Sequence, residues 1–68
     1  MRWLVVIEQA LGNFSAYVPD LPGCVATGDT IEDVERKMRE AIDFHMEDLR
    51  DAGEPVPEPT SQLTHVDV

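Results

Sequence analysis

The chain has 68 residues, which allows a single domain spanning 1–68 with a small hydrophobic core. Fourteen acidic residues against five basic ones give a formal net charge of −9 at pH 7, a field that repels phosphate backbones, so we expect no direct binding of nucleic acid. The apolar run 3–7 is too short for a signal peptide or a membrane span, and the single cysteine excludes an intramolecular disulfide, so we expect a cytoplasmic protein with no membrane contact.

The N-terminal third of the chain predicts a β-hairpin. Residues 3–10 are rich in β-branched and aromatic side chains, and residues 14–18 alternate in polarity, as strands do. Gly12 and Asn13 between them predict a two-residue type II′ turn. The predicted cross-strand pairs are Leu11–Phe14, Gln9–Ala16, Glu8–Tyr17 and Ile7–Val18.

A short third strand and a long helix follow. Two prolines prevent residues 19–23 from continuing the ladder, and residues 24–27 are expected to form the third strand. Apolar residues recur at helical spacing over 31–52, with Thr30 as the N-cap and Gly53 in the left-handed position after the last turn. The acid-first i,i+4 pairs expected on this helix are Glu32–Arg36, Asp33–Lys37 and Glu35–Arg39.

The end of the chain predicts a fourth strand. Residues 56–59 form a linker that contains two prolines. The side chains of residues 63–68 then alternate between two sides, with Thr64, Val66 and Val68 on one side. The element order is therefore β-β-β-α-β, and the fold class is α+β. A right-handed crossover places the last strand beside the first, which predicts a four-stranded sheet of order 3-2-1-4 with the helix packed on one face.

The hairpin pattern divides the apolar residues between the two faces of the sheet. The residues expected under the helix are Trp3, Val5, Ile7, Phe14, Ala16 and Val18. Leu4, Val6 and Tyr17 point the other way, where no second helix covers them. Exposed apolar patches on small proteins typically mark interfaces, so we expect a homodimer or higher homo-oligomer that uses these three residues, or burial of this face by a partner.

Two groups of residues raise the question of chemistry. In the first group, Cys24 is a candidate nucleophile and His45 a candidate base, with Asp20 to orient the base. In the second group, Cys24, His45 and His65 are candidate metal ligands. His45, however, lies in the middle of the apolar stripe of the helix, where a histidine is usually packed. None of the spacings is typical of a nucleophilic or zinc site. We therefore expect no enzyme activity, no catalytic residue, no metal and no cofactor.

Acidic residues crowd the second half of the helix. A solvated face explains them, and docking of a basic protein partner is the sharper interpretation, because such a cluster accelerates and orients association. The loop 19–23 is a second candidate surface, because a rigid loop loses little order on binding. The predicted partner-binding residues are Asp20, Leu21, Pro22, Gly23, Asp43, Glu47 and Asp51.

Several of these segments resemble the HicB family of antitoxins. They are Val-Pro-Asp-Leu-Pro-Gly-Cys at 18–24, Thr-Gly-Asp-Thr at 27–30, Ala-Ile-Asp-Phe-His at 41–45 and Gly-Glu-Pro-Val-Pro at 53–57. The resemblance implies a partial ribonuclease-H-like fold. It also implies a partner, a small basic HicA-like toxin that cleaves messenger RNA with a histidine.

The resemblance further implies the antitoxin role in a type II toxin–antitoxin pair, in which direct binding keeps RNA away from the toxin. Many family members carry a DNA-binding segment after the last strand. This sequence resembles a short form without it, so DNA binding and autoregulation are not carried over. The alternative is a solitary HicB-like oligomeric binding or scaffold domain with another protein partner. A weak hydrolase or nuclease that uses Cys24, His45 or the carboxylates is the third hypothesis.

Overall fold

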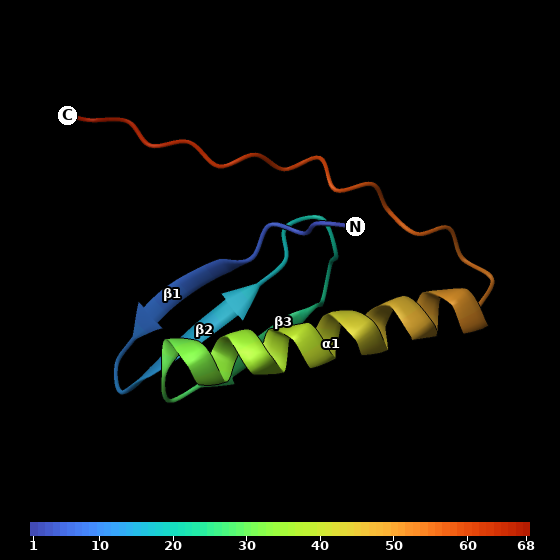
Figure 1. Ribbon diagram of the computed structural model, residues 1–68, viewed down its shortest axis with the longest axis horizontal. Helices are drawn as coiled ribbons and strands as arrows, with labels where there is room; N and C mark the ends of the chain where they lie inside the picture. Colours follow the sequence, from blue (N-terminus) through green and yellow to red (C-terminus); the bar gives the residue numbers. More distant parts are fainter.

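A computed structural model describes residues 1–68, which form an antiparallel sheet, one long helix and an extended C-terminal segment (Figure 1). The strands are β1 (Val6–Ala10), β2 (Asn13–Tyr17) and β3 (Val25–Gly28), in the order β1-β2-β3. The helix α1 spans Ile31–Asp51 and lies against one face of the sheet. The α+β class is confirmed.

The hairpin differs from the predicted one by two residues in register. Val6 pairs with Tyr17 and Ile7 pairs with Ala16, so the turn falls on Leu11 and Gly12 and not on Gly12 and Asn13. Gly12 has a φ of 84° at the second central position, which fits a type II turn and not the predicted type II′. Because side chains alternate with a period of two, a shift of two residues leaves every side chain on its predicted face.

Both ends of α1 are closed by the expected residues. The Thr30 hydroxyl accepts a hydrogen bond from the backbone N–H of Asp33 at 3.0 Å. At the other end the Gly53 N–H donates to the Arg50 carbonyl, and the Glu54 N–H donates to the Leu49 carbonyl. These two bonds form a Schellman motif, for which the left-handed φ of 71° at Gly53 is required.

Only part of the predicted pattern of ion pairs forms on α1. Lys37 contacts Asp33 at 3.2 Å, as predicted. Arg36 pairs with Asp33 at 2.8 Å and with Glu40 at 3.2 Å, and not with Glu32. The predicted Glu35–Arg39 pair is absent. These contacts leave three of the five basic residues outside any ion pair: Arg2, Arg39 and Arg50.

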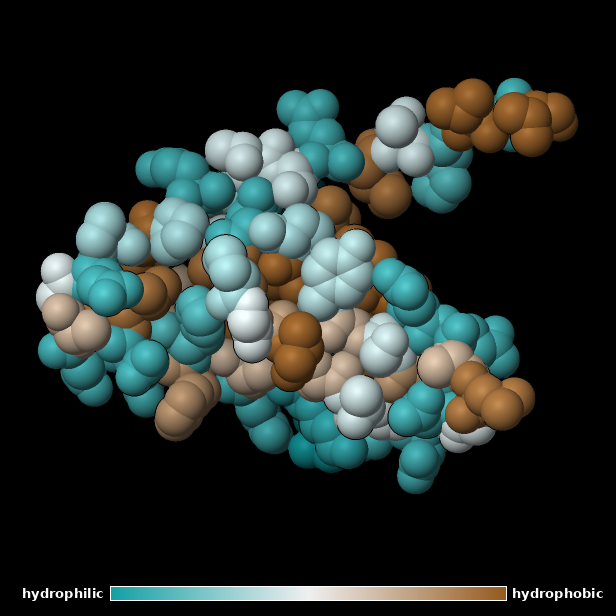
Figure 2. Space-filling model, turned by 180° about the vertical axis from the view of Figure 1, so that it is seen from behind, coloured by the Kyte–Doolittle hydropathy of each residue, from teal (hydrophilic) through white to brown (hydrophobic).

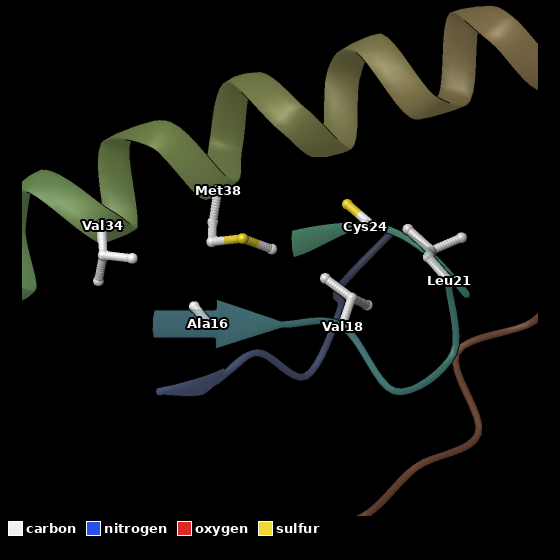
Figure 3. Packing of buried hydrophobic residues seen from close by; sticks show 6 residues of the cluster. All are labelled: Ala16, Val18, Leu21, Cys24, Val34 and Met38. Atoms are coloured by element: carbon white, nitrogen blue, oxygen red, sulfur yellow. The ribbon is translucent and has the colours of Figure 1, made fainter. Parts of the chain in front are cut away.

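The core lies between α1, β2 and the loop before β3 (Figure 3). Val34 and Met38 point from the helix towards the sheet and are essentially inaccessible to solvent. The other buried members of this cluster are Ala16, Val18, Leu21 and Cys24. Trp3, Val5, Ile7 and Phe14 pack against it, so the predicted helix-facing set is confirmed.

The fourth strand is absent from the structure. Residues 63–68 are extended, exposed and without a partner, so the sheet has three strands and the predicted order 3-2-1-4 is not observed. Figure 1 shows the segment passing the N-terminal residues and then diverging from β1. No helix of the structure is both long and apolar enough to span a membrane.

Candidate protein-binding surfaces

The loop 19–23 is a closed and partly buried turn. The Leu21 N–H donates to the Val18 carbonyl and the Cys24 N–H donates to the Leu21 carbonyl, each at 3.1 Å. Leu21 is 0% exposed, so its side chain is a core residue, although the sequence placed it among the partner-binding residues. Pro22 and Gly23 are exposed and remain accessible at the surface. The buried leucine therefore fixes the loop, and its neighbours form the accessible surface.

The carboxylate of Asp20 is bound within the molecule. It accepts hydrogen bonds from the backbone N–H of Ser61 at 3.0 Å, from the Ser61 hydroxyl at 2.9 Å and from the Thr60 hydroxyl at 3.2 Å. These bonds, above all the one from the Ser61 N–H, hold the pKa of the Asp20 carboxyl below its ordinary value. In this structure Asp20 therefore anchors the C-terminal segment to the loop.

The second half of α1 presents an exposed aromatic side chain inside a stripe of acids. Phe44 is 72% exposed. Residues three, four and seven positions away lie on the same helix face. The acids that flank Phe44 in this way are Glu40, Glu47, Asp48 and Asp51, all exposed. We call Phe44 and these four acids the Phe44 stripe; two of them, Glu47 and Asp51, are predicted partner-binding residues.

Asp43 lies at the edge of the Phe44 stripe. It precedes Phe44 by one residue, about 100° around the helix, and precedes Glu47 by four, so it is a neighbour of Glu47 on the helix surface. It also lines a hollow with Trp3, Met46 and Arg50. The structure therefore places Asp43 between the stripe and this hollow.

The loop and the helix meet at a shallow hollow beside β3. Gly23 and Val25 line it from the sheet side, and Ala41, Phe44 and His45 line it from α1. Phe44 is exposed and lines this hollow, whereas the side chain of Val25 lies on the sheet face that points away from α1. Phe44 therefore supplies the exposed apolar surface of the hollow. This hollow joins the exposed part of the 19–23 loop to the Phe44 stripe in one continuous surface.

The sheet face that points away from α1 carries a row of apolar residues across the three strands. Val6 lies opposite Tyr17, and Tyr17 lies opposite Val25. None of the three belongs to the core, and Tyr17 and Val25 are exposed. Leu4, the third residue predicted on this face, lines a hollow with Leu63 of the C-terminal segment.

Cys24 and His45 border the same hollow, but their surroundings do not suit nucleophilic chemistry. Cys24 is buried, and burial raises the pKa of its thiol, which disfavours the reactive thiolate. No hydrogen bond joins Cys24 to His45, and His45 is half-buried on α1. Asp20, the residue suggested to orient the base, is bonded to the C-terminal segment.

Comparison with known proteins gives a consistent result. The family model described as the HicB-like antitoxin of bacterial toxin–antitoxin systems matches residues 3–67. In a solved structure of a HicA3 and HicB3 toxin–antitoxin complex, one chain matches with a TM-score of 0.70 and 31% identity. That match covers 87% of this chain and 72% of the other.

Curated relatives come from a phage and from bacteria. A 14.9 kDa protein of the rep-hol intergenic region of Haemophilus phage HP1 is 35% identical over 57 residues, which are 84% of this chain and 43% of the relative. A UPF0150 protein of Synechocystis is 37% identical over 82% of this chain and 72% of its own length. A UPF0150 protein of Helicobacter pylori is 41% identical over 65% of this chain and 61% of its own length. The chain thus spans less than half of the phage relative.

Proposed function

This chain belongs to the HicB-like antitoxins of bacterial toxin–antitoxin systems, and from that premise we propose that it neutralises a HicA-like, messenger-RNA-cleaving toxin by direct binding. An antitoxin is a regulatory protein and not an enzyme, which agrees with the sequence-based expectation. The observation that carries the proposal is the Phe44 stripe, an exposed aromatic residue surrounded by acids on a chain of net charge −9.

The chemistry of the Phe44 stripe suits a basic protein. A toxin that binds RNA presents positive charge where it expects phosphate, and the acids of α1 complement that charge. Aromatic residues at the centre of an interface supply most of its binding energy, whereas a polar rim mainly supplies specificity and association rate. Phe44 is placed to act as such an anchor, with Glu40, Glu47 and Asp51 around it.

The exposed part of the 19–23 loop extends this surface. Gly23 lines the same hollow as Phe44, and the loop is held by its own hydrogen bonds and by buried Leu21. A surface that is already ordered loses little conformational entropy when a partner binds. We propose that this loop and the Phe44 stripe contact the toxin together.

Two finer points belong to the proposal. We propose that the free edge of β1 accepts a fourth strand formed by residues 63–68, which gives the sheet order 3-2-1-4. We also propose that the chain forms a homo-oligomer in the cytoplasm and does not contact nucleic acid by itself. The apolar residues Val66 and Val68, which share one side of an extended segment and are exposed here, support the first point, because pairing with β1 allows them to be buried.

The proposal is tested by an RNA-cleavage assay. A purified HicA toxin is mixed with a structured messenger RNA, and the purified chain is added in increasing amounts. The proposed function predicts that cleavage stops near equimolar chain and that Phe44→Ala weakens inhibition about tenfold or more. Leu11→Ala, which truncates another exposed apolar side chain, at the turn between β1 and β2, is the control. Persistent cleavage with several HicA toxins would favour the solitary-domain alternative.

A further inference from the structure

A groove runs between the N-terminal segment and α1, on the open side of β1. Its apolar lining comes from Trp3, Val5 and Ile7 on the sheet side and from Met38 and Ile42 on the helix. β1 pairs only with β2, so its other edge presents a row of unpaired backbone N–H and C=O groups beside the groove. Natural proteins cover or pair such an edge. The groove therefore lacks one strand.

The C-terminal segment is what such a groove requires. Residues 63–68 are extended, and Leu63 and Val66 are 70% and 78% exposed. Figure 2 shows hydrophobic atoms gathered at the projecting end of the chain. In a strand, Val66 and Val68 share one side, so pairing with β1 in the register that turns this side towards α1 brings both against the apolar lining. The segment and the groove both expose apolar side chains, and each is able to bury those of the other.

The direction of residues 63–68 indicates whether they fill the groove of their own chain or the groove of a second copy. Thr60 and Ser61 are hydrogen-bonded to Asp20, and Leu63 lines a hollow together with residues 2–5 of the N-terminal segment. Beyond this point the chain diverges from its own β1 (Figure 1). The three bonds to Asp20 thus fix the base of the segment in an orientation that projects its apolar end away from its own groove.

We propose that residues 63–68 of one chain pair with β1 of a second copy and fill its groove. Residues 63–68 of the second copy pair with β1 of the first in the same way. Reciprocal exchange of an identical segment is a low-cost route to a two-fold dimer. It covers both open edges and both apolar segments with a single symmetric arrangement. The inference rests on the fourth strand proposed above and specifies which molecule supplies it.

The test compares two substitutions at adjacent positions. Val66→Asp places a carboxylate in the apolar groove, whereas His65→Asp places it on the opposite side of the segment. Sedimentation velocity at micromolar concentration is expected to show a dimer for the unsubstituted chain and for His65→Asp. Val66→Asp is expected to weaken the dimer about tenfold or more, because an unpaired charge in an apolar groove is costly. Val68→Asp serves as a second variant, and circular dichroism verifies that each variant is folded.

Two outcomes overturn the inference. A monomeric unsubstituted chain excludes the exchange. A dimer that survives Val66→Asp and Val68→Asp but dissociates with Tyr17→Glu uses the outer sheet face instead. The toxin assay is read separately: a monomeric Val66→Asp chain that still inhibits the toxin separates dimerisation from neutralisation. A dimer that exchanges segments but inhibits no toxin supports the exchange and removes the proposed function.

Discussion

The Asp20 carboxylate accepts two hydrogen bonds from Ser61, one from the backbone N–H at 3.0 Å and one from the hydroxyl at 2.9 Å, across 41 positions of sequence. This contact joins the loop before β3 to the start of the C-terminal segment. It gives a structural role to an acid whose position in an exposed loop suggested partner binding. The loop thereby determines the direction in which the last residues leave the domain.

Asp20→Asn is expected to release the C-terminal segment without unfolding the domain. The amide offers one acceptor oxygen and no charge in place of a carboxylate that accepts three bonds, so the Ser61 contact weakens. Hydrogen exchange at the Ser61 amide should become several-fold faster, while amides of β2 stay unchanged. Asp51→Asn, which removes an exposed acid without a hydrogen bond, should leave Ser61 exchange unaltered. Equal exchange in all three proteins would contradict the anchoring role.

Acid should release the same segment. The pKa of Asp20 is lowered in the folded chain by its bonds to Ser61, so this contact stabilises the fold fully above the ordinary aspartate pKa of about 3.9. The stabilisation is lost as the pH falls through the lowered pKa of Asp20. The Ser61 amide resonance should therefore shift below about pH 4. Asp33, whose pKa is lowered mainly by the hydrogen bond from Arg36, titrates in the same direction, so Asp20→Asn is the reference that isolates the Asp20 effect.

Leu21→Ala is expected to destabilise the domain by about 2–5 kcal/mol, the usual cost of truncating a buried leucine. The side chain is 0% exposed and lies in the core cluster with Val18 and Cys24. A domain of this size has little stability to lose, so much of the protein should be unfolded at 37 °C. Leu11→Ala, at a fully exposed turn position, should change the free energy of unfolding by less than about 0.5 kcal/mol. Urea denaturation measures both, and a surface role for Leu21 would make the two variants alike.

Local patterns predicted most of this fold because they depend on near neighbours in sequence. The period of the apolar residues and the caps at Thr30 and Gly53 fixed α1 to within one residue of the predicted 31–52. The hairpin faces were also predicted, because the error of two residues in register preserves the alternation that places Ile7 and Ala16 under the helix. The register itself was wrong, since Gly12 suits either central position of a two-residue turn.

Contacts between distant residues were beyond prediction from one sequence. Nothing local indicates that Asp20 binds Thr60 and Ser61, or that Leu21 turns inwards. The fourth strand was predicted from the alternation of 63–68, but pairing also depends on where the linker directs the segment. Phe44 was missed as a surface residue, although the sequence carried a signal for it. It lies off the apolar stripe of α1 that contains Val34, Met38 and Ile42, which indicates an exposed position.

Gly28→Ala is expected to cost about 1–3 kcal/mol, because it overpacks the junction between β3 and α1. A Cβ at Gly28 would lie 2.8 Å from the Asp33 carboxylate and 2.9 Å from the Val34 backbone nitrogen. The helix start would have to move, which disturbs the cap formed by Thr30. Thr27→Ala, in the same strand but exposed, is the control and should be nearly neutral. Thermal unfolding of the two variants compares them, and equal midpoints would show that the junction has room.

Charge reversal on the Phe44 stripe should slow association with a HicA toxin. Glu47→Lys combined with Asp51→Lys changes the charge by +4 beside Phe44, where a basic partner is expected to dock. Glu54→Lys combined with Glu58→Lys changes the charge equally, but on the exposed chain after α1. Stopped-flow measurements at low salt should give an association rate reduced about tenfold or more for the first variant, with a weaker dependence on salt, because electrostatic steering depends on where the charge is placed. If the two variants slow association equally, only net charge matters, and the toxin docks elsewhere.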